Sequence, residues 1–386
     1  MQICALSTPI VAYFSTKRKG FIKVLAMFVK KLSLYNFRNY ANEEILFDDG
    51  LNILVGENAQ GKTNAIEGIY LLATGTSPRI SSDRELIMLG KNDARICAEV
   101  ETSSGDIEVE MALSRSTKKC AKINGLVIAK IGELIGNVRV VYFSPDEMSL
   151  IKDSPDFRRR FMDVDLSQIN RNYFYTLNKY TKILRQRNTL LKDSDEKKVK
   201  ETIAVWDEQL AREGAKLVVY RKEFCEVLSK EAKIVHDKIA TDEDLSVSYY
   251  TLATGKTEKE IAESIEIALL TNRDRDMHLG FTSVGPQRDD LKIALNGIDL
   301  RTFGSQGQQR TATLSLKLAE INIFEKLTGE KPILILDDVM SELDRKRRAR
   351  LMQACKGGQT IITTTETADL YMEESNVIKV QNGKVI

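Results

Sequence analysis

The sequence is poor in the residues on which most metal, redox and acid–base sites depend. It contains two histidines and five cysteines among 386 residues, and no two cysteines form a CxxC pair. This scarcity disfavours a zinc site, a disulfide framework and a histidine-centred mechanism, and it is typical of a reduced, cytoplasmic protein. No apolar run approaches the roughly 18 residues of a membrane helix, so we expect no membrane partner.

Neither sign of charge dominates the chain. Its 57 lysine and arginine residues oppose 55 aspartate and glutamate residues, which leaves a formal net charge of +2. Whole-chain electrostatics therefore favours no class of partner, and any nucleic-acid surface has to be local.

Hydrophobic periodicity predicts an α/β fold at both ends of the chain. In the first part we expect strands at 29–34 and 51–55, a helix at 63–73, and several short strands across 94–128 with a turn at Asn124-Gly125. After residue 280 we expect strands at 291–295, 333–336 and 360–362 and a helix at 308–327. The two parts are predicted to form one α/β unit.

Between residues 150 and 240 apolar residues recur at steps of three and four, which predicts two long amphipathic helices. The polar stretch 192–198 separates them, so we expect an antiparallel hairpin. Its aromatic stripe is interpreted as core packing: Tyr173, Tyr180, Trp206 and Phe224. The predicted domains are an N-terminal extension at 1–26, disordered or upstream of the true start, an α/β lobe made of 27–145 and 276–386, and a helical lobe at 146–275.

A predicted strand–loop–helix segment carries the phosphate-binding loop pattern GxxxxGKT. Its residues are Gly56, Glu57, Asn58, Ala59, Gln60, Gly61, Lys62 and Thr63. Glycines at both ends let consecutive backbone N–H groups point inward, and the helix start adds the positive end of a dipole. Lys62 would place a cation at the β- and γ-phosphates, and Thr63 would offer a hydroxyl to Mg²⁺. The segment therefore predicts a nucleotide site with Mg²⁺.

Two carboxylates follow the apolar strand at 333–336. Paired acids at the end of a buried strand are costly unless a cation is near. We assign Asp337 to the metal, with Thr63, and Asp338 to orienting or deprotonating the attacking water, with Lys62 as the second catalytic residue. Asp338 could instead cap the next turn.

Two further strings narrow the class of hydrolase. The string Ser305-Gln306-Gly307-Gln308-Gln309-Arg310 resembles the signature segment of ABC-type ATPases, and Ser341-Glu342-Leu343-Asp344 resembles their D-loop. In that architecture the signature serine and helix start of one subunit meet the γ-phosphate held by the other subunit's P-loop. Taken alone, the first string also suits an ordinary helix N-cap.

Together these strings resemble the RecF family, recombination mediators of the SMC-like branch of ABC ATPases, over essentially all of 27–386. Besides the P-loop with Asn64 after it, the resemblance is carried by strings in this order: Asn36 to Tyr40, Pro145 to Glu147, Ser154 to Asp163, Gly285 to Leu291, the signature string, and Leu336 to Asp344.

The resemblance implies an ABC/SMC-like P-loop ATPase head with an inserted helical, coiled-coil-like hairpin lobe. It implies an ATP-dependent homodimer that binds DNA at single-strand gaps or junctions, cooperates with RecR and RecO, and promotes RecA loading. It also implies a weak, Mg²⁺-dependent, DNA-stimulated ATPase. Beyond the P-loop, the ATP-binding positions it implies are Arg38, Asn64, Ser305, Gly307 and Gln308.

The chain departs from these patterns at two places. Gln287 follows Gly-Pro where the RecF family often has histidine, so we interpret it as structural. The strand at 360–365 offers hydroxyls where ABC transporters have a switch histidine. We therefore expect slow hydrolysis that times the dimer rather than drives a motor.

Residues 152–192 carry ten basic and four acidic side chains, the best candidate for a local DNA-binding stripe. Four of the basic residues recur along the first long helix and could contact phosphates: Lys179, Lys182, Arg185 and Arg187. A solvated helix face explains the same pattern. For Arg158 to Arg160, internal ion pairs are at least as plausible as DNA contacts.

Two other functions are compatible with a P-loop. One is a transport-type ABC nucleotide-binding subunit, against which the long helical hairpin and the absent switch histidine count. The other is a non-hydrolysing clamp on DNA in which ATP is only a ligand.

Overall fold

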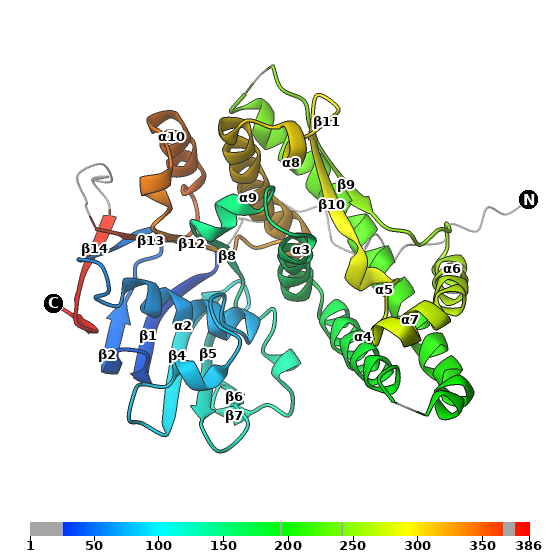
Figure 1. Cartoon of the computed structure of the whole chain (residues 1–386). Coiled ribbons are helices and arrows are strands. Elements are labelled where there is room, and N and C mark those ends of the chain that lie inside the picture. The colour runs from blue at the N-terminus through cyan, green and yellow to red at the C-terminus, as the bar shows by residue number, and fades with distance from the viewer. Residues whose placement is uncertain (1–25, 194, 241, 366–374) are drawn as a thin grey trace, which may run out of the picture. The chain divides into compact units, whose positions relative to one another are not determined.

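The computed structural model describes residues 26–193, 195–240, 242–365 and 375–386. These residues divide into two compact units (Figure 1). The sheet unit contains the described residues of 22–150, 234–242 and 306–386, and the helical unit contains those of 151–233 and 243–305. The expectation for residues 1–26 falls outside the described residues, apart from Ala26.

The first sheet of the sheet unit is antiparallel, with the strand order β2-β1-β4-β5-β6-β7. Its strands are β1 (Phe28–Phe37), β2 (Tyr40–Leu46), β4 (Asp93–Thr102), β5 (Gly105–Ser114), β6 (Cys120–Ile123) and β7 (Leu126–Val127). Buried and more exposed residues alternate along β4 and β5, because one face of this sheet is packed. Asn124 and Gly125 make the predicted two-residue turn between β6 and β7, both with positive φ.

The second sheet has the order β15-β14-β3-β13-β12-β8 and is parallel apart from the terminal hairpin of β14 and β15. Its strands are β3 (Leu51–Val55), β8 (Val140–Phe143), β12 (Ile333–Asp337), β13 (Thr360–Thr364), β14 (Ser375–Gln381) and β15 (Lys384–Val385). Every residue of β8, β12 and β13 is buried, as expected for strands covered on both faces.

The helices of the sheet unit are α2 (Lys62–Thr74), α9 (Gln306–Thr328) and α10 (Arg345–Ala354), with short 3₁₀ turns η1 (Asp83–Leu86), η2 (Ile131–Glu133), η3 (Asp146–Ser149) and η5 (Val339–Glu342). Helix α2 packs against β1, β4 and β5 on one side and β8, β12 and β13 on the other (Figure 1). Its first residue, Lys62, directly follows the loop after β3.

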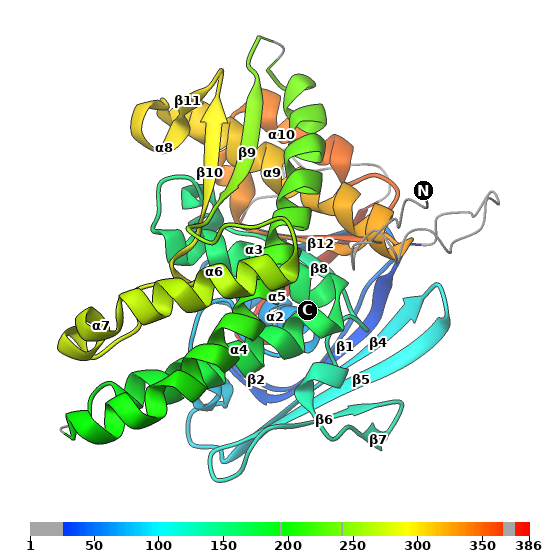
Figure 2. The same cartoon turned by 90° about the vertical axis from the view of Figure 1, so that its right-hand side faces the viewer.

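The helical unit is built around α3 (Pro155–Ile169), α4 (Arg171–Leu190) and α5 (Glu196–Asp237). The last residues of α5, from 234 onward, belong to the sheet unit. Figure 2 shows α4 and the first part of α5 as the predicted antiparallel hairpin. The unit also contains β9 (Leu245–Tyr250), α6 (Glu258–Thr271), α7 (Arg273–Leu279), η4 (Pro286–Arg288), β10 (Asp290–Leu295), β11 (Ile298–Asp299) and α8 (Leu300–Phe303).

The elements predicted from periodicity are present. The sequence missed the helices α3, α6, α7, α8 and α10 and the strands β2, β8, β9, β11, β14 and β15. Of the aromatic stripe, Tyr173, Tyr180 and Phe224 are buried and Trp206 is half-buried. Residues 276–305 belong to the helical unit, whereas the sequence assigned them to the α/β lobe. The reason is that β10 pairs with β9 and that Arg221 of α5 donates to the Pro286 carbonyl at 2.8 Å.

Candidate nucleotide-binding site

The loop from Gly56 to Gly61 joins the end of β3 to the start of α2, as its pattern predicts. A Cβ added at Gly56 would lie 2.3 Å from the Val380 carbonyl oxygen, and Gly61 has a φ of 121°, so both positions require glycine. Glu57, Asn58 and Ala59 are exposed at the tip of the loop.

Lys62 folds back across this loop. Its ammonium donates to the carbonyl oxygens of Gly56 at 2.6 Å and Glu57 at 2.8 Å. Burial lowers the pKa of the Lys62 ammonium, while Asp338 and Asp337 oppose that shift. The Lys62 ammonium thus lies over the loop, and its contact with the β- and γ-phosphates stays a prediction.

Asp337, the last residue of β12, is buried and receives three hydrogen bonds. The Thr63 hydroxyl donates to its Oδ1 at 2.8 Å, the Thr363 hydroxyl to the same oxygen at 2.7 Å, and the Tyr142 hydroxyl to Oδ2 at 2.9 Å. Burial, followed by the charge of Asp337, raises the pKa of Tyr142, so its phenol remains a donor. The fold thereby brings together the two residues predicted to hold Mg²⁺.

These oxygen ligands fit Mg²⁺, which binds through one or two protein oxygens plus substrate phosphates. Within the part of the chain that the structure describes, no group of three acidic, histidine or cysteine side chains could hold a metal ion by itself. Thr63 and Asp337 would therefore hold Mg²⁺ together with a nucleotide.

Asp338 has a left-handed backbone with a φ of 53°, which turns it away from the line of β12. Its backbone N–H donates to the Thr363 hydroxyl at 3.0 Å, and its side chain is exposed. Partial desolvation and the charge of Asp337 raise the pKa of the Asp338 carboxyl, and Lys62 opposes them. A raised pKa suits the predicted role as a proton acceptor.

The turn between β1 and β2 supports the loop from behind. Asn39 donates to the Gln60 carbonyl at 3.0 Å, Tyr40 donates to the Gly61 carbonyl at 3.0 Å, and Asn64 donates to the Asn39 side chain at 2.9 Å. The sequence indicated this segment only through its family resemblance, and its hydrogen bonds to the phosphate-binding loop were not predicted.

Arg38, in the same turn, forms a two-pronged ion pair with Glu67 of α2, with both distances at 2.8 Å. A third donor reaches the Glu85 carbonyl at 3.1 Å. Glu67 is buried and also accepts from Ser77 at 2.5 Å. In this structure the Arg38 guanidinium thus braces α2, and its contact to a nucleotide stays a prediction.

Ser305 is exposed and stands directly before α9, whose first residues Gln306 and Gly307 are also exposed. Gln308 is half-buried in the first turn. The start of a long helix with a serine before it can bind a phosphate from outside. The signature string therefore lies at a surface that another molecule can reach.

The predicted DNA contacts on α4 divide into two groups. Lys182 and Arg185 are exposed, and Lys179 pairs with Glu213 at 2.7 Å while its side chain stays half-exposed. Arg187 is fully buried, which overturns its assignment to DNA. It follows Tyr173 and Tyr180 at seven-residue spacing and so lies on the packed face.

The Arg187 guanidinium is the centre of a buried ionic cluster. It pairs with Asp207 of α5 at 2.6 Å and with Asp276 of α7 at 2.8 Å, and it donates to the Thr282 hydroxyl at 2.9 Å. Both carboxylates are themselves buried. Arg187 therefore ties α4 and α5 of the hairpin to α7.

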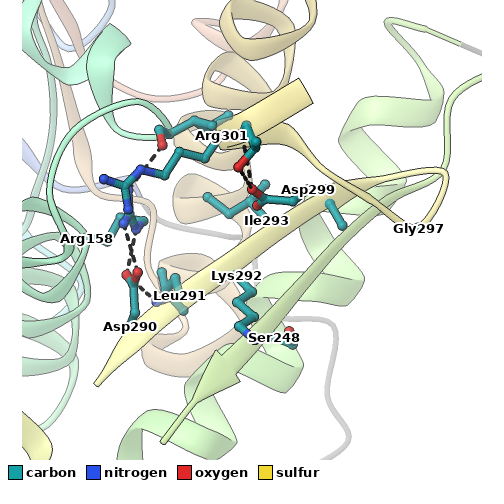
Figure 3. A pocket seen from close by; sticks show the side chains of 12 residues that line it. Arg158, Ser248, Asp290, Leu291, Lys292, Ile293, Gly297, Asp299 and Arg301 are labelled. Carbon is teal, nitrogen blue, oxygen red and sulfur yellow. Dashed lines mark hydrogen bonds and ion pairs between the residues drawn. The ribbon is translucent and has the colours of Figure 1, made fainter. Parts of the chain in front are cut away.

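Arg158 also has an internal role. It lines a pocket of about 570 Å³ in the helical unit, beside β10 and α8 (Figure 3). Its guanidinium pairs with both oxygens of Asp290, at 2.6 and 2.8 Å, and donates to the Ile151 and Asp153 carbonyls. For Arg158, the internal ion pair weighed for this string is the arrangement found.

Gln287 accepts a hydrogen bond from Tyr180 of α4 and donates to the Val284 carbonyl at 2.8 Å. Both contacts hold η4 in place, in agreement with a structural role for the residue that replaces the histidine.

Across the described ranges, none of the helices has the length and apolar character to cross a bilayer.

A phosphate-binding loop joined to an acidic strand end through Thr63 and Asp337, with α2 between two sheets and a signature-like string before α9, defines an ATPase of the ABC/SMC type. A family model described as the RecF/RecN/SMC N terminal domain matches residues 28–385. The chain belongs to the RecF family.

Curated relatives support this at full length. The chain is 46% identical over 366 residues to the DNA replication and repair protein RecF of Alkaliphilus oremlandii, covering 93% of this chain and 100% of that protein. It is 40% identical over 365 residues to the protein of the same name from Clostridium acetobutylicum, covering 93% and 99%.

Solved structures agree. The recombination mediator protein RecF bound to ATP matches with a TM-score of 0.87 and 35% identity, covering 95% of this chain and 99% of that one. The Smc head domain of Pyrococcus furiosus matches with a TM-score of 0.53 and 16% identity, covering 93% and 96%. The second likeness concerns the fold alone.

Proposed function

We propose that the protein is an ATP-dependent recombination mediator in which two copies clasp ATP between the P-loop of one and the signature string of the other. The dimer would bind DNA at single-strand gaps or junctions and, with RecR and RecO, promote RecA loading. Two observations together carry the proposal: Thr63 and Asp337 are already joined by a hydrogen bond, and Ser305 is exposed directly before α9.

The residues act on the nucleotide in separable ways. The loop N–H groups and Lys62 bind the phosphates, Thr63 and Asp337 hold Mg²⁺, and Asp338 accepts a proton from the attacking water. Mg²⁺ held by Thr63 and Asp337 would supply positive charge that neutralises the phosphates. The Thr363 hydroxyl fixes Asp337 and the Asp338 backbone, but it supplies no titrating group, so we expect slow turnover.

A slow ATPase suits a switch. ATP stabilises whichever state binds it more tightly, so a nucleotide shared between copies favours the dimer until it is hydrolysed. The membrane-transport alternative is disfavoured by the hairpin of α4 and α5 in the helical unit. The non-hydrolysing alternative would be favoured if replacing Asp338 by Asn left phosphate release unchanged.

Sedimentation velocity with and without ATP and Mg²⁺, in the presence and absence of gapped DNA, tests the proposal. We expect a dimer with ATP and Mg²⁺ that binds the gapped DNA. A protein that binds ATP but stays monomeric at every protein concentration would contradict the proposal. So would a dimer whose formation does not depend on ATP.

A further inference from the structure

The start of α9, which contains most of the signature string, is linked to the D-loop string by an arginine from α10. Arg347 lies in the first turn of α10, and its guanidinium contacts α9. Its Nη2 donates to the Gly307 carbonyl at 2.8 Å and to the Thr311 hydroxyl at 2.6 Å, and its Nε donates to the same hydroxyl at 3.0 Å. One side chain therefore holds the first two turns of α9, at Gly307 and at Thr311.

The same guanidinium is fixed on the D-loop side. Its Nη1 pairs with Asp344, the last residue of the D-loop string, and the Asp344 carboxylate caps α10 by accepting from the Arg347 backbone N–H at 3.0 Å. These contacts, the backbone bond first, lower the pKa of the Asp344 carboxyl, so it stays charged. Arg347 is thus clamped between Asp344 and Gly307.

Two neighbouring contacts extend this link in the sheet unit. Arg310 donates to the carbonyl and to the carboxylate of Glu342, both at 3.2 Å, in a partly exposed pair. The Ser341 hydroxyl donates to the Asp338 backbone carbonyl at 2.9 Å, which connects the D-loop string to the backbone of Asp338. The hydrogen-bonded chain therefore runs from Asp338 through the D-loop string to the beginning of α9.

The chemistry of the contact is specific to arginine. A planar guanidinium can donate to Gly307, Thr311 and Asp344 at once, because its donors diverge in a fixed fork. A lysine ammonium at the same position could satisfy part of this set. Exposed ion pairs contribute little, and the Arg347 side chain is less exposed than Arg310 and also donates to Gly307 and Thr311, so this contact outweighs the Arg310–Glu342 pair.

We propose that Arg347 is a positioning residue: it fixes the beginning of α9 against the D-loop string, so that each copy presents both segments to the other copy's ATP as one rigid surface. The idea rests on the proposed sharing of ATP between copies. Arg347 itself acts through Gly307 and Thr311 and needs no contact with the nucleotide.

The test compares Arg347→Ala, Arg347→Lys and the matched control Lys346→Ala, which removes an exposed cation from the same turn of α10. The full-length protein is titrated by sedimentation with ATP and Mg²⁺, and ATP binding to the monomer is measured separately at low protein concentration. We expect Arg347→Ala to raise the protein concentration at which half is dimeric about tenfold or more, with monomer affinity for ATP unchanged. Arg347→Lys should recover part of the loss, and Lys346→Ala should match the unmodified protein.

A double-mutant cycle asks whether Arg347 acts through α9. Thr311→Val removes the hydroxyl that Arg347 contacts, so the combination with Arg347→Ala should cost less than the two single losses added together. Full additivity, an unchanged dimerisation curve for Arg347→Ala, or an equal loss of ATP affinity in the monomer would each overturn the positioning role.

Ser305→Arg, run in the same assay, separates this inference from the proposed function. If Ser305→Arg abolishes the dimer while Arg347→Ala leaves the dimerisation curve unchanged, the shared nucleotide stands and the role of Arg347 is rejected. If neither variant affects the dimer, the proposed sharing of ATP itself is rejected.

Discussion

Thr63 and Asp337 are 274 residues apart in the sequence and are joined by a hydrogen bond of 2.8 Å. One comes from the first turn of α2 and the other from the end of β12. The bond exists because β13 lies between β3 and β12 in the parallel sheet, which aligns the carboxyl ends of all three strands. A nucleotide bound at Gly56 to Lys62 therefore meets the acidic strand end directly.

Replacing Lys62 by Met should abolish ATP-dependent dimerisation. The change keeps the length and apolar stem of the side chain but removes the cation that now bonds to Gly56 and Glu57. Gel filtration with ATP and Mg²⁺ at matched protein concentrations checks this. A persisting dimer would count against the shared-nucleotide account.

Hydrolysis should depend on the ionisation of Asp338. Its pKa is raised by partial desolvation and by Asp337, so the active carboxylate form should be lost as the pH falls through a value above the usual aspartate pKa of about 4. Single-turnover phosphate release should therefore decline toward acid pH, and Asp338→Asn should abolish release at every pH. Unchanged release by Asp338→Asn would favour the non-hydrolysing clamp.

Arg187→Met should destabilise the protein by about 3–5 kcal/mol, because Asp207 loses one of its two cations, Asp276 loses its ion-pair partner, and both carboxylates stay buried. Denaturant unfolding measures the change. DNA affinity per folded molecule should be unchanged, since Arg187 is not at the surface. A stable variant with weakened DNA binding would restore the original assignment.

Lys182→Glu combined with Arg185→Glu should weaken DNA binding and flatten its dependence on salt, because fewer counterions are released per bound protein. Lys179 is left intact in this variant, since it also neutralises Glu213. Lys259→Glu on α6 reverses the charge of an exposed lysine in the same unit and serves as the control. An unaltered salt slope would discard this face of α4.

Local motifs predicted the parts of the site that are contiguous in sequence. Gly56 to Thr63 and Asp337-Asp338 were identified because a strand end, glycines and a basic or acidic residue occur together. The hydrogen bonds from Tyr142 and Thr363, which complete the environment of Asp337, were not predicted. They reach it through the register of three parallel strands, which single-sequence patterns do not encode.

Arg187 shows a second limit of sequence patterns, because here the charge pattern gave a wrong prediction. Charge density alone placed it with Lys182 and Arg185, although its spacing from Tyr173 and Tyr180 matched the packed face. The charge pattern could not reveal Asp207 and Asp276, which approach from two other helices. A basic residue in phase with a buried stripe is better interpreted as an internal ion pair.

Mixing Lys62→Met with Ser305→Arg tests the shared nucleotide most directly. Each variant alone should stay monomeric with ATP and Mg²⁺ and hydrolyse almost nothing. In the mixed dimer, the P-loop of the Ser305→Arg copy faces the unaltered serine of the Lys62→Met copy, so one site is intact. The account predicts that mixing restores dimers and up to about half the unmodified turnover per dimer, as expected for one working site of two. A mixture as inactive as its components would contradict it.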